Sequence, residues 1–128
     1  MTLRSPLSRV LGSGSAKEGT EHWWMQRVTS VALLLLGAWF LLSIRGIGSF
    51  QQAELFAWVA YPVNAVMLLL LSVTLCWHSM LGVQVVIEDY VHGPAIKVVS
   101  LLLNKFVHVF FGLAAVFAVL TVSLGGGG

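Results

Sequence analysis

The sequence has very little charge. Asp, Glu, Lys and Arg make up 9% of its 128 residues, whereas 58% are hydrophobic and the mean hydropathy is +0.91. About a quarter of the residues in a typical soluble domain are charged, so seven basic and five acidic side chains are too few to cover a water-facing surface. The composition therefore predicts an integral membrane protein and excludes a soluble globular one.

Cysteine and concentrated positive charge are also scarce. Cys76 is the single cysteine, so an internal disulfide is excluded, and its place inside an apolar run indicates a small hydrophobic residue. The net charge is only +2, and no basic patch alternates with aromatic residues. We therefore expect no nucleic-acid partner.

The two ends of the sequence contain no long apolar run. Residues 1–20 are rich in Gly, Ser and basic residues but lack the apolar core of a secretory signal. They faintly resemble a mitochondrial transit peptide, but the segment is short, Glu18 lies near its end and Glu21 follows it directly. We predict a flexible cytoplasmic N-terminal arm over 1–20 and a glycine tail over 125–128.

Three long hydrophobic runs lie between these ends, at about 28–47, 56–87 and 98–124. A helix of about 20 apolar residues crosses the ~30 Å hydrocarbon core of a bilayer. The second run is longer than that, which predicts a tilted helix or one that begins outside the core, with Pro62 in its first turns. The predicted fold is all-α, with three transmembrane helices forming one membrane anchor over 21–124.

Lys and Arg are distributed unequally around the three runs. Four precede the first run, whereas Arg45 alone follows it and Lys97 alone lies between the second and third runs. Loops rich in Lys and Arg stay in the cytoplasm. The asymmetry therefore predicts a cytoplasmic N-terminus, an external C-terminus and a cytoplasmic position for Asp89 and Tyr90.

One histidine lies deep in the second run. In a helix, His78 and Asp89 are separated by about 1100°, three turns plus about 20°, so they share one face and lie about 16 Å apart along the axis. His78 is then near mid-membrane. A neutral imidazole at this depth indicates an axial haem ligand, with Gly82 one turn later leaving room for the porphyrin. A histidine hydrogen-bonded to a neighbouring helix is the alternative.

Other polar residues lie near the predicted interface. Arg27 suits either a haem propionate or a simple interfacial anchor, and Ser30, one turn later, adds a hydroxyl to the same face. Tyr90 and Asp89 indicate a quinone site, because a phenol donates to a quinone oxygen and a carboxylate orients it or relays protons. An interfacial aromatic beside a solvated acid is the alternative.

The third run carries Lys105 and His108. If that run enters the membrane near Lys97, His108 lies eleven residues in, at about the depth of His78. A haem held by two histidines of this chain is then geometrically possible, but we favour a polar contact between helices, or a water-lined histidine, for His108.

The combination of these features is more specific than any one of them. The sequence has three runs, QRVTS at 26–30 opening the first, and HSMLGVQVVIEDY at 78–90 closing the second. From Glu21 to about Leu124 it resembles the hydrophobic membrane-anchor subunits of succinate dehydrogenase, respiratory complex II. The opening HWWMQRVTS is similar to the alphaproteobacterial and mitochondrial branch of that family.

This resemblance implies a specific function. It implies that His78 is one axial ligand of haem b, that a second anchor subunit supplies the other, and that Arg27 lies near the haem propionates and the quinone. It also implies that Tyr90, supported by Asp89, binds ubiquinone. The flavoprotein and iron–sulfur subunits then dock on the cytoplasmic face of the bacterial inner membrane, with the mitochondrial inner membrane as the alternative. They feed electrons from succinate to ubiquinone in the tricarboxylic acid cycle and aerobic respiration.

The resemblance gives this chain no flavin site and no catalytic residue of its own. Three alternatives stay open. The first is the anchor of a fumarate reductase, and the second is another small b-type cytochrome. The third is a non-catalytic membrane scaffold in which His78 is merely packed.

Overall fold

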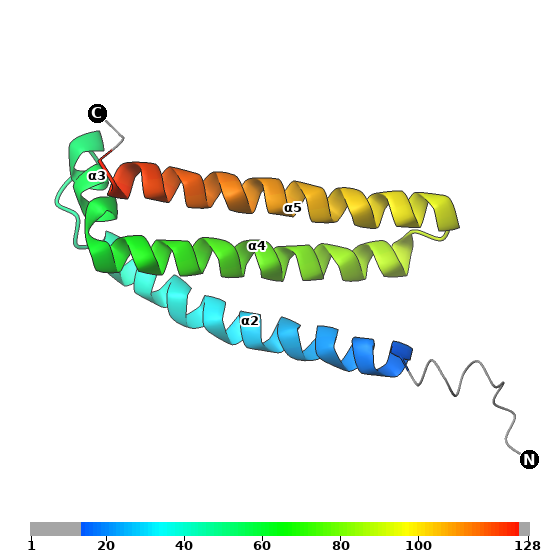
Figure 1. Cartoon of the computed structure of the whole chain (residues 1–128). Coiled ribbons are helices and arrows are strands. Elements are labelled where there is room, and N and C mark those ends of the chain that lie inside the picture. The colour runs from blue at the N-terminus through cyan, green and yellow to red at the C-terminus, as the bar shows by residue number, and fades with distance from the viewer. Residues whose placement is uncertain (1–13, 126–128) are drawn as a thin grey trace, which may run out of the picture.

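The structure, a computed structural model, describes residues 14–125. Four helices follow one another: α2 (Gly14–Ile44), α3 (Gln52–Ala60), α4 (Pro62–Tyr90) and α5 (Pro94–Ser123). The three long helices run side by side in alternating directions, with the short α3 at one end (Figure 1). No strand is present in the described part of the chain, so the predicted all-α fold is confirmed.

The long helices form a layer with α4 in the middle. Helix α4 contacts both α2 and α5, whereas α2 and α5 do not contact each other within the described residues. Figure 1 shows α2 diverging from α4 towards its N-terminal end. Each side of α4 therefore has one helical neighbour, and side chains that join the helices must reach from α4 to α2 or from α4 to α5.

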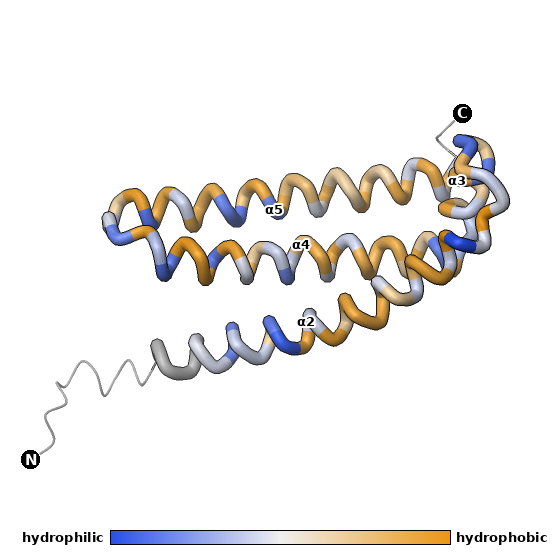
Figure 2. Tube along the Cα trace, turned by 180° about the vertical axis from the view of Figure 1, so that it is seen from behind, coloured by the Kyte–Doolittle hydropathy of each residue, from blue (hydrophilic) through white to orange (hydrophobic). Residues whose placement is uncertain are grey.

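The lengths and surfaces of these helices suit a bilayer. Residues Gly19–Ile44 of α2 and the whole of α4 and α5 are long and apolar enough to span a membrane. Hydrophobic residues continue around the outside of the helices (Figure 2), and few described residues are buried, among them Ala65 and Leu81. A chain with so little interior is stabilised chiefly by what surrounds it, and the three predicted spans are confirmed in number.

The first helix begins earlier than the predicted span at 28. Residues 14–20, which we predicted to belong to a flexible arm, are helical, and the rest of that arm lies outside the described residues. No proline interrupts the chain between residues 14 and 44, so the helix continues past the apolar run. It ends at Ile44, where Gly46 closes a turn by donating its N–H to the Ser43 carbonyl.

The second apolar run is divided between two helices, so our prediction of one span over 56–87 is wrong at its beginning. Helix α3 ends at Ala60 and α4 begins at Pro62. Between them Tyr61 is extended, with φ −64° and ψ 124°, because a residue that precedes proline is disfavoured in the helical region. Proline itself is well placed at the first position of α4, and α4 continues to Tyr90.

Side chains attach α3 to the ends of the long helices. The indole N–H of Trp58 donates to the Ser43 hydroxyl at 3.1 Å, and the Asn64 amide donates to the Trp58 carbonyl at 2.9 Å. The rings of Trp39 and Trp58 stack with their centroids 6.0 Å apart. Helix α3 is thus an ordered cap at this end of the layer.

The link between α4 and α5 consists of residues 91–93 alone. Pro94 begins α5, four residues before the predicted start at 98, and the Lys97 ammonium donates to the Glu88 carbonyl across the link at 3.0 Å. This link lies at the same end as the start of α2, opposite the end that carries α3 and the last turn of α5 (Figure 1). Of the predicted glycine tail, Gly125 is described, with a left-handed φ of 84°, and 126–128 lie outside the described residues.

Candidate functional site

His78 joins α4 to α2 near the middle of both helices. Its Nδ1 lies 2.9 Å from the hydroxyl oxygen of Thr29 on α2. Thr29 is only 7% exposed, and its hydroxyl also lies 2.7 Å from the carbonyl of Met25 in the preceding turn. His78 is half-buried, and no described residue contacts its Nε2 by a hydrogen bond. One ring nitrogen of His78 is therefore held by the protein and the other has no partner within the described chain.

Gly82, one turn after His78, is also covered by α2. A Cβ at Gly82 would lie 3.8 Å from Nε2 of Gln26. Gln26, Thr29 and His22 follow the spacing i, i+4 and i+7 from residue 22, which places them on one face of α2. We call these three residues the α2 polar stripe. The role of Gly82 in making room for a haem stays a prediction.

The α2 polar stripe was not singled out in the sequence, and neither was Thr29 as a partner of His78. Two of its atoms, His22 Nε2 and Gln26 Oε1, are buried without a hydrogen-bond partner among the described residues. The helical spacing of three polar residues within a hydrophobic anchor was the signal that could have identified the stripe. It could not have identified His78 as the residue opposite.

Arg27 takes no part in the contact between Thr29 and His78. It is exposed, and its guanidinium carbon lies 5.1 Å from the centre of the Trp23 ring, a cation–π contact. No ion pair holds it within residues 14–125. Because Arg27 precedes Thr29 by two residues, about 3 Å of helix rise, its backbone lies near the level of His78 and far from that of Tyr90. Ser30 donates its hydroxyl to the Gln26 carbonyl at 2.7 Å and is thus engaged within its own helix.

Asp89 and Tyr90 are the last two residues of α4, at the end of the layer where α2 begins (Figure 1). Tyr90 is 78% exposed, and Asp89 is also exposed. Neither side chain forms a hydrogen bond with another described residue. Their neighbour Glu88, by contrast, accepts a hydrogen bond from the Gln84 amide at 2.8 Å. The structure therefore leaves the phenol and the carboxylate open, and it separates them from His78 along α4.

His108 joins α5 to α4. Its Nδ1 lies 2.8 Å from the Asn104 carbonyl, and its Nε2 lies 3.0 Å from the Ser79 hydroxyl. A carbonyl only accepts, so Nδ1 carries the proton and Nε2 accepts from Ser79. Asn104 is 7% exposed and donates to the Met80 carbonyl at 3.0 Å. The polar contact between helices that we favoured for His108 is confirmed, and contact with Ser79 places it at the predicted depth, next to His78.

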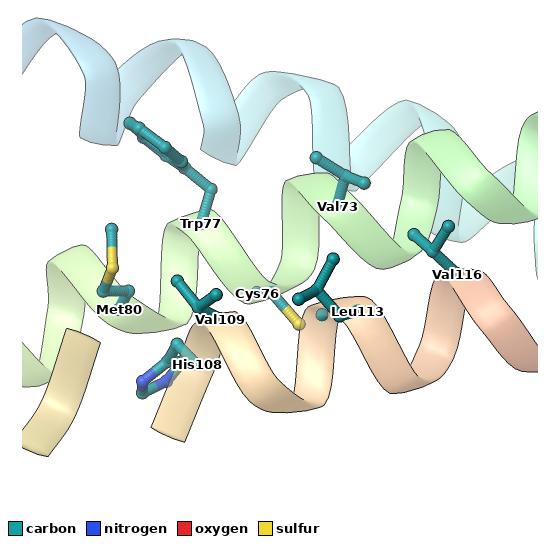
Figure 3. Close-up of a pocket in the computed structure, with 9 residues that line it drawn as sticks. Val73, Cys76, Trp77, Met80, His108, Val109, Leu113 and Val116 are labelled. Carbon is teal, nitrogen blue, oxygen red and sulfur yellow. The ribbon is translucent and has the colours of Figure 1, made fainter. Parts of the chain in front are cut away.

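An apolar pocket of about 230 Å³ lies beside this contact, between α4 and α5. Figure 3 shows its lining side chains, with His108 at one end. A Cβ on Gly112 would lie 3.7 Å from both Cβ and Sγ of Cys76, so the two helices approach closely here. Cys76 therefore packs between helices as a small hydrophobic residue. His78 does not line this pocket, which is lined by Val73, Cys76, Trp77, Met80, His108, Val109, Gly112, Leu113 and Val116.

Comparison with known proteins finds one family, both by a family model and by individual relatives. The sequence model of the family described as "Succinate dehydrogenase/Fumarate reductase transmembrane subunit" matches residues 1–122. The chain is 30% identical over 125 residues to the succinate dehydrogenase hydrophobic membrane anchor subunit of Paracoccus denitrificans, covering 94% of this chain and 93% of that protein.

Two further relatives cover shorter stretches. The anchor subunit of the same name from Rickettsia bellii (strain RML369-C) is 37% identical over 89 residues, 69% of this chain and 70% of its own length. The succinate dehydrogenase membrane anchor subunit of Reclinomonas americana is 33% identical over 92 residues, 70% of this chain and 77% of its own length. The similarity is thus shared by bacterial and mitochondrial-type relatives.

Proposed function

This chain belongs to the succinate dehydrogenase/fumarate reductase transmembrane subunit family, and we propose that it holds one side of a haem b and part of a ubiquinone-reduction site. It is a multi-pass membrane anchor of an oxidoreductase complex, and it associates there with other subunits. The names of its relatives favour a succinate dehydrogenase over a fumarate reductase or another small b-type cytochrome.

The donor set around His78 fits a haem iron. A neutral imidazole binds iron through one ring nitrogen while the other forms a hydrogen bond to the protein, and His78 has one nitrogen of each kind. No group of three or more His, Cys, Asp or Glu side chains gathers within residues 14–125 to hold a metal by themselves. That suits an iron whose other ligands come from a porphyrin and from a partner subunit; the haem, when bound, supplies one-electron transfer.

The second axial ligand comes from another subunit. His108 lies at the depth of His78, but both its ring nitrogens already have partners on α4 and α5. His22 is on the α2 polar stripe, seven residues from Thr29 and hence about 10 Å away along the axis. We therefore assign the second ligand to a partner anchor subunit that packs against this layer, where it also covers polar atoms that lack a partner within the described part of the chain.

Arg27 is better placed for a haem propionate than for the quinone, because its backbone lies near the level of His78. Its guanidinium lies over the Trp23 ring and forms no hydrogen bond or ion pair with another described residue, which leaves its five N–H donors for an anion. A propionate carboxylate beside it would be recognised by two parallel hydrogen bonds.

Tyr90 and Asp89 provide the groups that a quinone needs at a membrane surface. The phenol donates to a quinone oxygen, and the carboxylate accepts or relays the proton that accompanies reduction. Both are exposed and unengaged at one end of α4. We place this end in the cytoplasm, following the distribution of Lys and Arg. The iron–sulfur and flavoprotein subunits dock on the same side and deliver electrons from succinate to ubiquinone.

The observation that carries this proposal is the His78 ring, with Nδ1 held by Thr29 and Nε2 without a hydrogen-bond partner among residues 14–125. In the purified native complex, His78→Leu should remove the haem or change its reduced-minus-oxidised spectrum. His108→Leu, at the same depth, is the matched control and should retain the parental spectrum. A complex that loses haem through His108→Leu and keeps it through His78→Leu would contradict the assignment, and a parent without Soret absorbance would leave only a membrane scaffold.

A further inference from the structure

We propose that Thr29 is a positioning residue for His78. Its hydroxyl fixes the imidazole in the Nδ1–H form and leaves the Nε2 lone pair for the iron. This inference rests on the proposed haem ligation by His78. It adds a residue on a different helix that determines which nitrogen is offered, how the ring is turned, and how strongly the ligand donates to the metal.

The direction of the hydrogen bonds follows from the number of protons. The Thr29 hydroxyl has one proton, and its oxygen lies 2.7 Å from the Met25 carbonyl and 3.2 Å from the Gln26 carbonyl. Two oxygens 2.7 Å apart without a proton between them repel each other, so the proton is donated to Met25. The hydroxyl must then accept from His78, 2.9 Å away, which requires the proton of the imidazole to be on Nδ1.

The surroundings make this arrangement rigid. Thr29 is β-branched, which restricts rotation about χ1, and its hydroxyl is bound to its own helix. It is 7% exposed, so water has little access to replace it as the acceptor. Turning the His78 ring would leave a half-buried N–H without a partner, which costs about 1–3 kcal/mol. The contact between α2 and α4 thus determines the orientation of the ring.

The kind of acceptor also has a consequence for the iron. A carboxylate in this place would draw the Nδ1 proton towards itself and make the imidazole a stronger donor. A hydroxyl is a neutral, weaker acceptor, so His78 binds as a neutral imidazole with modest assistance. Removal of the hydroxyl should weaken this donation further, destabilise the ferric state relative to the ferrous state, and make the haem midpoint potential more positive.

The test compares three variants of the native complex. Thr29→Val keeps the shape and removes the acceptor, whereas Thr29→Ser keeps the hydroxyl. Thr121→Val is the matched control, because the Thr121 hydroxyl donates to the Phe117 carbonyl four residues back and forms no hydrogen bond with another described helix. Haem affinity, the midpoint potential, and the largest g-value of the ferric haem by electron paramagnetic resonance are measured for each.

Thr29→Val should weaken haem retention by roughly 10–100-fold, as loss of a partner to a metal-bound histidine typically does. The retained haem should show a more positive potential and a shifted g-value, while Thr29→Ser and Thr121→Val keep the parental values. If Thr29→Val fails to assemble, Thr29→Cys, which keeps a similar size with a weaker acceptor, should show the same shifts to a smaller extent.

Parental potential, g-value and haem affinity in Thr29→Val, or in Thr29→Cys where only that variant assembles, would overturn the inference. The proposed function would survive that result if His78→Leu still lost haem. If His78→Leu retained the parental haem spectrum, the proposed ligand would be wrong and the role of Thr29 would fall with it.

Discussion

The polar side chains of the described residues differ in how they are satisfied. Several atoms between helices are hydrogen-bonded, as Nδ1 of His78, both ring nitrogens of His108 and the NH2 group of Asn104 show, whereas Oδ1 of Asn104 and the two atoms of the α2 polar stripe are buried without a partner among these residues. Those at the end of α4, Asp89 and Tyr90, form no hydrogen bond with another described side chain. Polar groups in lipid must form their hydrogen bonds within the protein, whereas groups at the interface can bind water or a ligand. The unengaged residues are therefore where a substrate is best sought.

Tyr90→Phe tests this at the level of a single hydroxyl. The substitution keeps the ring and removes the donor to the quinone, whose reduction increases the negative charge on its oxygen. A hydrogen bond to a charged group is worth about 1.5–3 kcal/mol, so quinone reduction should slow by roughly one to two orders of magnitude. Succinate oxidation with a soluble artificial acceptor should be unchanged.

Tyr61→Phe is the matched control for this prediction. Tyr61 is the other of the two tyrosines, it is 60% exposed, and it immediately precedes α4 at the end opposite Tyr90. Removal of the Tyr61 hydroxyl should leave both quinone reduction and succinate oxidation unchanged. If Tyr90→Phe assembles and reduces ubiquinone at the parental rate, Tyr90 is an interfacial anchor and no more.

At the scale of the helices, the polar contacts that join α4 to α2 and α4 to α5, here called the two joints of α4, differ in how many histidine nitrogens they use. The joint with α2 holds a histidine that keeps one nitrogen without a partner among the described residues, whereas the joint with α5 uses both nitrogens of His108. The first suits ligand binding and the second suits adhesion between helices. The Asn104 amide strengthens the second joint by donating to a backbone carbonyl of α4.

His108→Phe should therefore reduce stability without removing the haem. It keeps an aromatic ring and breaks the hydrogen bond to Ser79, and an interhelical hydrogen bond in a membrane protein contributes about 0.6 kcal/mol on average and up to ~1.7 kcal/mol. Thermal inactivation of the purified complex should occur at a lower temperature than in the parent. Thr121→Val, which removes a hydrogen bond within α5 alone, should show little change, and unchanged stability in His108→Phe would show that this joint contributes nothing measurable.

The sequence predicted these helices better than the contacts between them. Apolar runs longer than a typical soluble helix indicated three spans. The second predicted span began too early because the hydrophobic residues on both sides of Pro62 concealed the break that this proline causes at Tyr61. The contact of Thr29 with His78 joins residues 49 positions apart. It depends on how α2 is rotated against α4, and in a membrane, where both lipid and protein neighbours are apolar, hydropathy does not indicate that rotation.

At the scale of the whole molecule, the structure is an open layer whose surface is apolar on nearly every side. Side chains as large as Phe106, Phe110 and Phe117 are more than two-thirds exposed. Such a surface fits lipid and a second membrane subunit, which is also where the proposed second haem ligand originates. The same features that confirm a membrane anchor therefore leave the candidate haem site incomplete within one chain.

The orientation of the layer is a prediction for the whole molecule. Three spans and a cytoplasmic N-terminus require the C-terminus to be external. A reporter that is active only in the cytoplasm, fused after Gly128, should give no signal, whereas the same reporter fused before Met1 should be active. A strong signal from the C-terminal fusion would contradict the arrangement and move Asp89 and Tyr90 away from the cytoplasmic side.

The short link between α4 and α5 also bears on how the two helices cross the bilayer. Three residues, 91–93, span at most about 10 Å when extended, only a third of the ~30 Å hydrocarbon core. The end of α4 and the start of α5 must therefore lie at the same surface of the bilayer, so the two helices form a hairpin whose arms cross in opposite directions. The direction in which α4 crosses then determines the direction of α5.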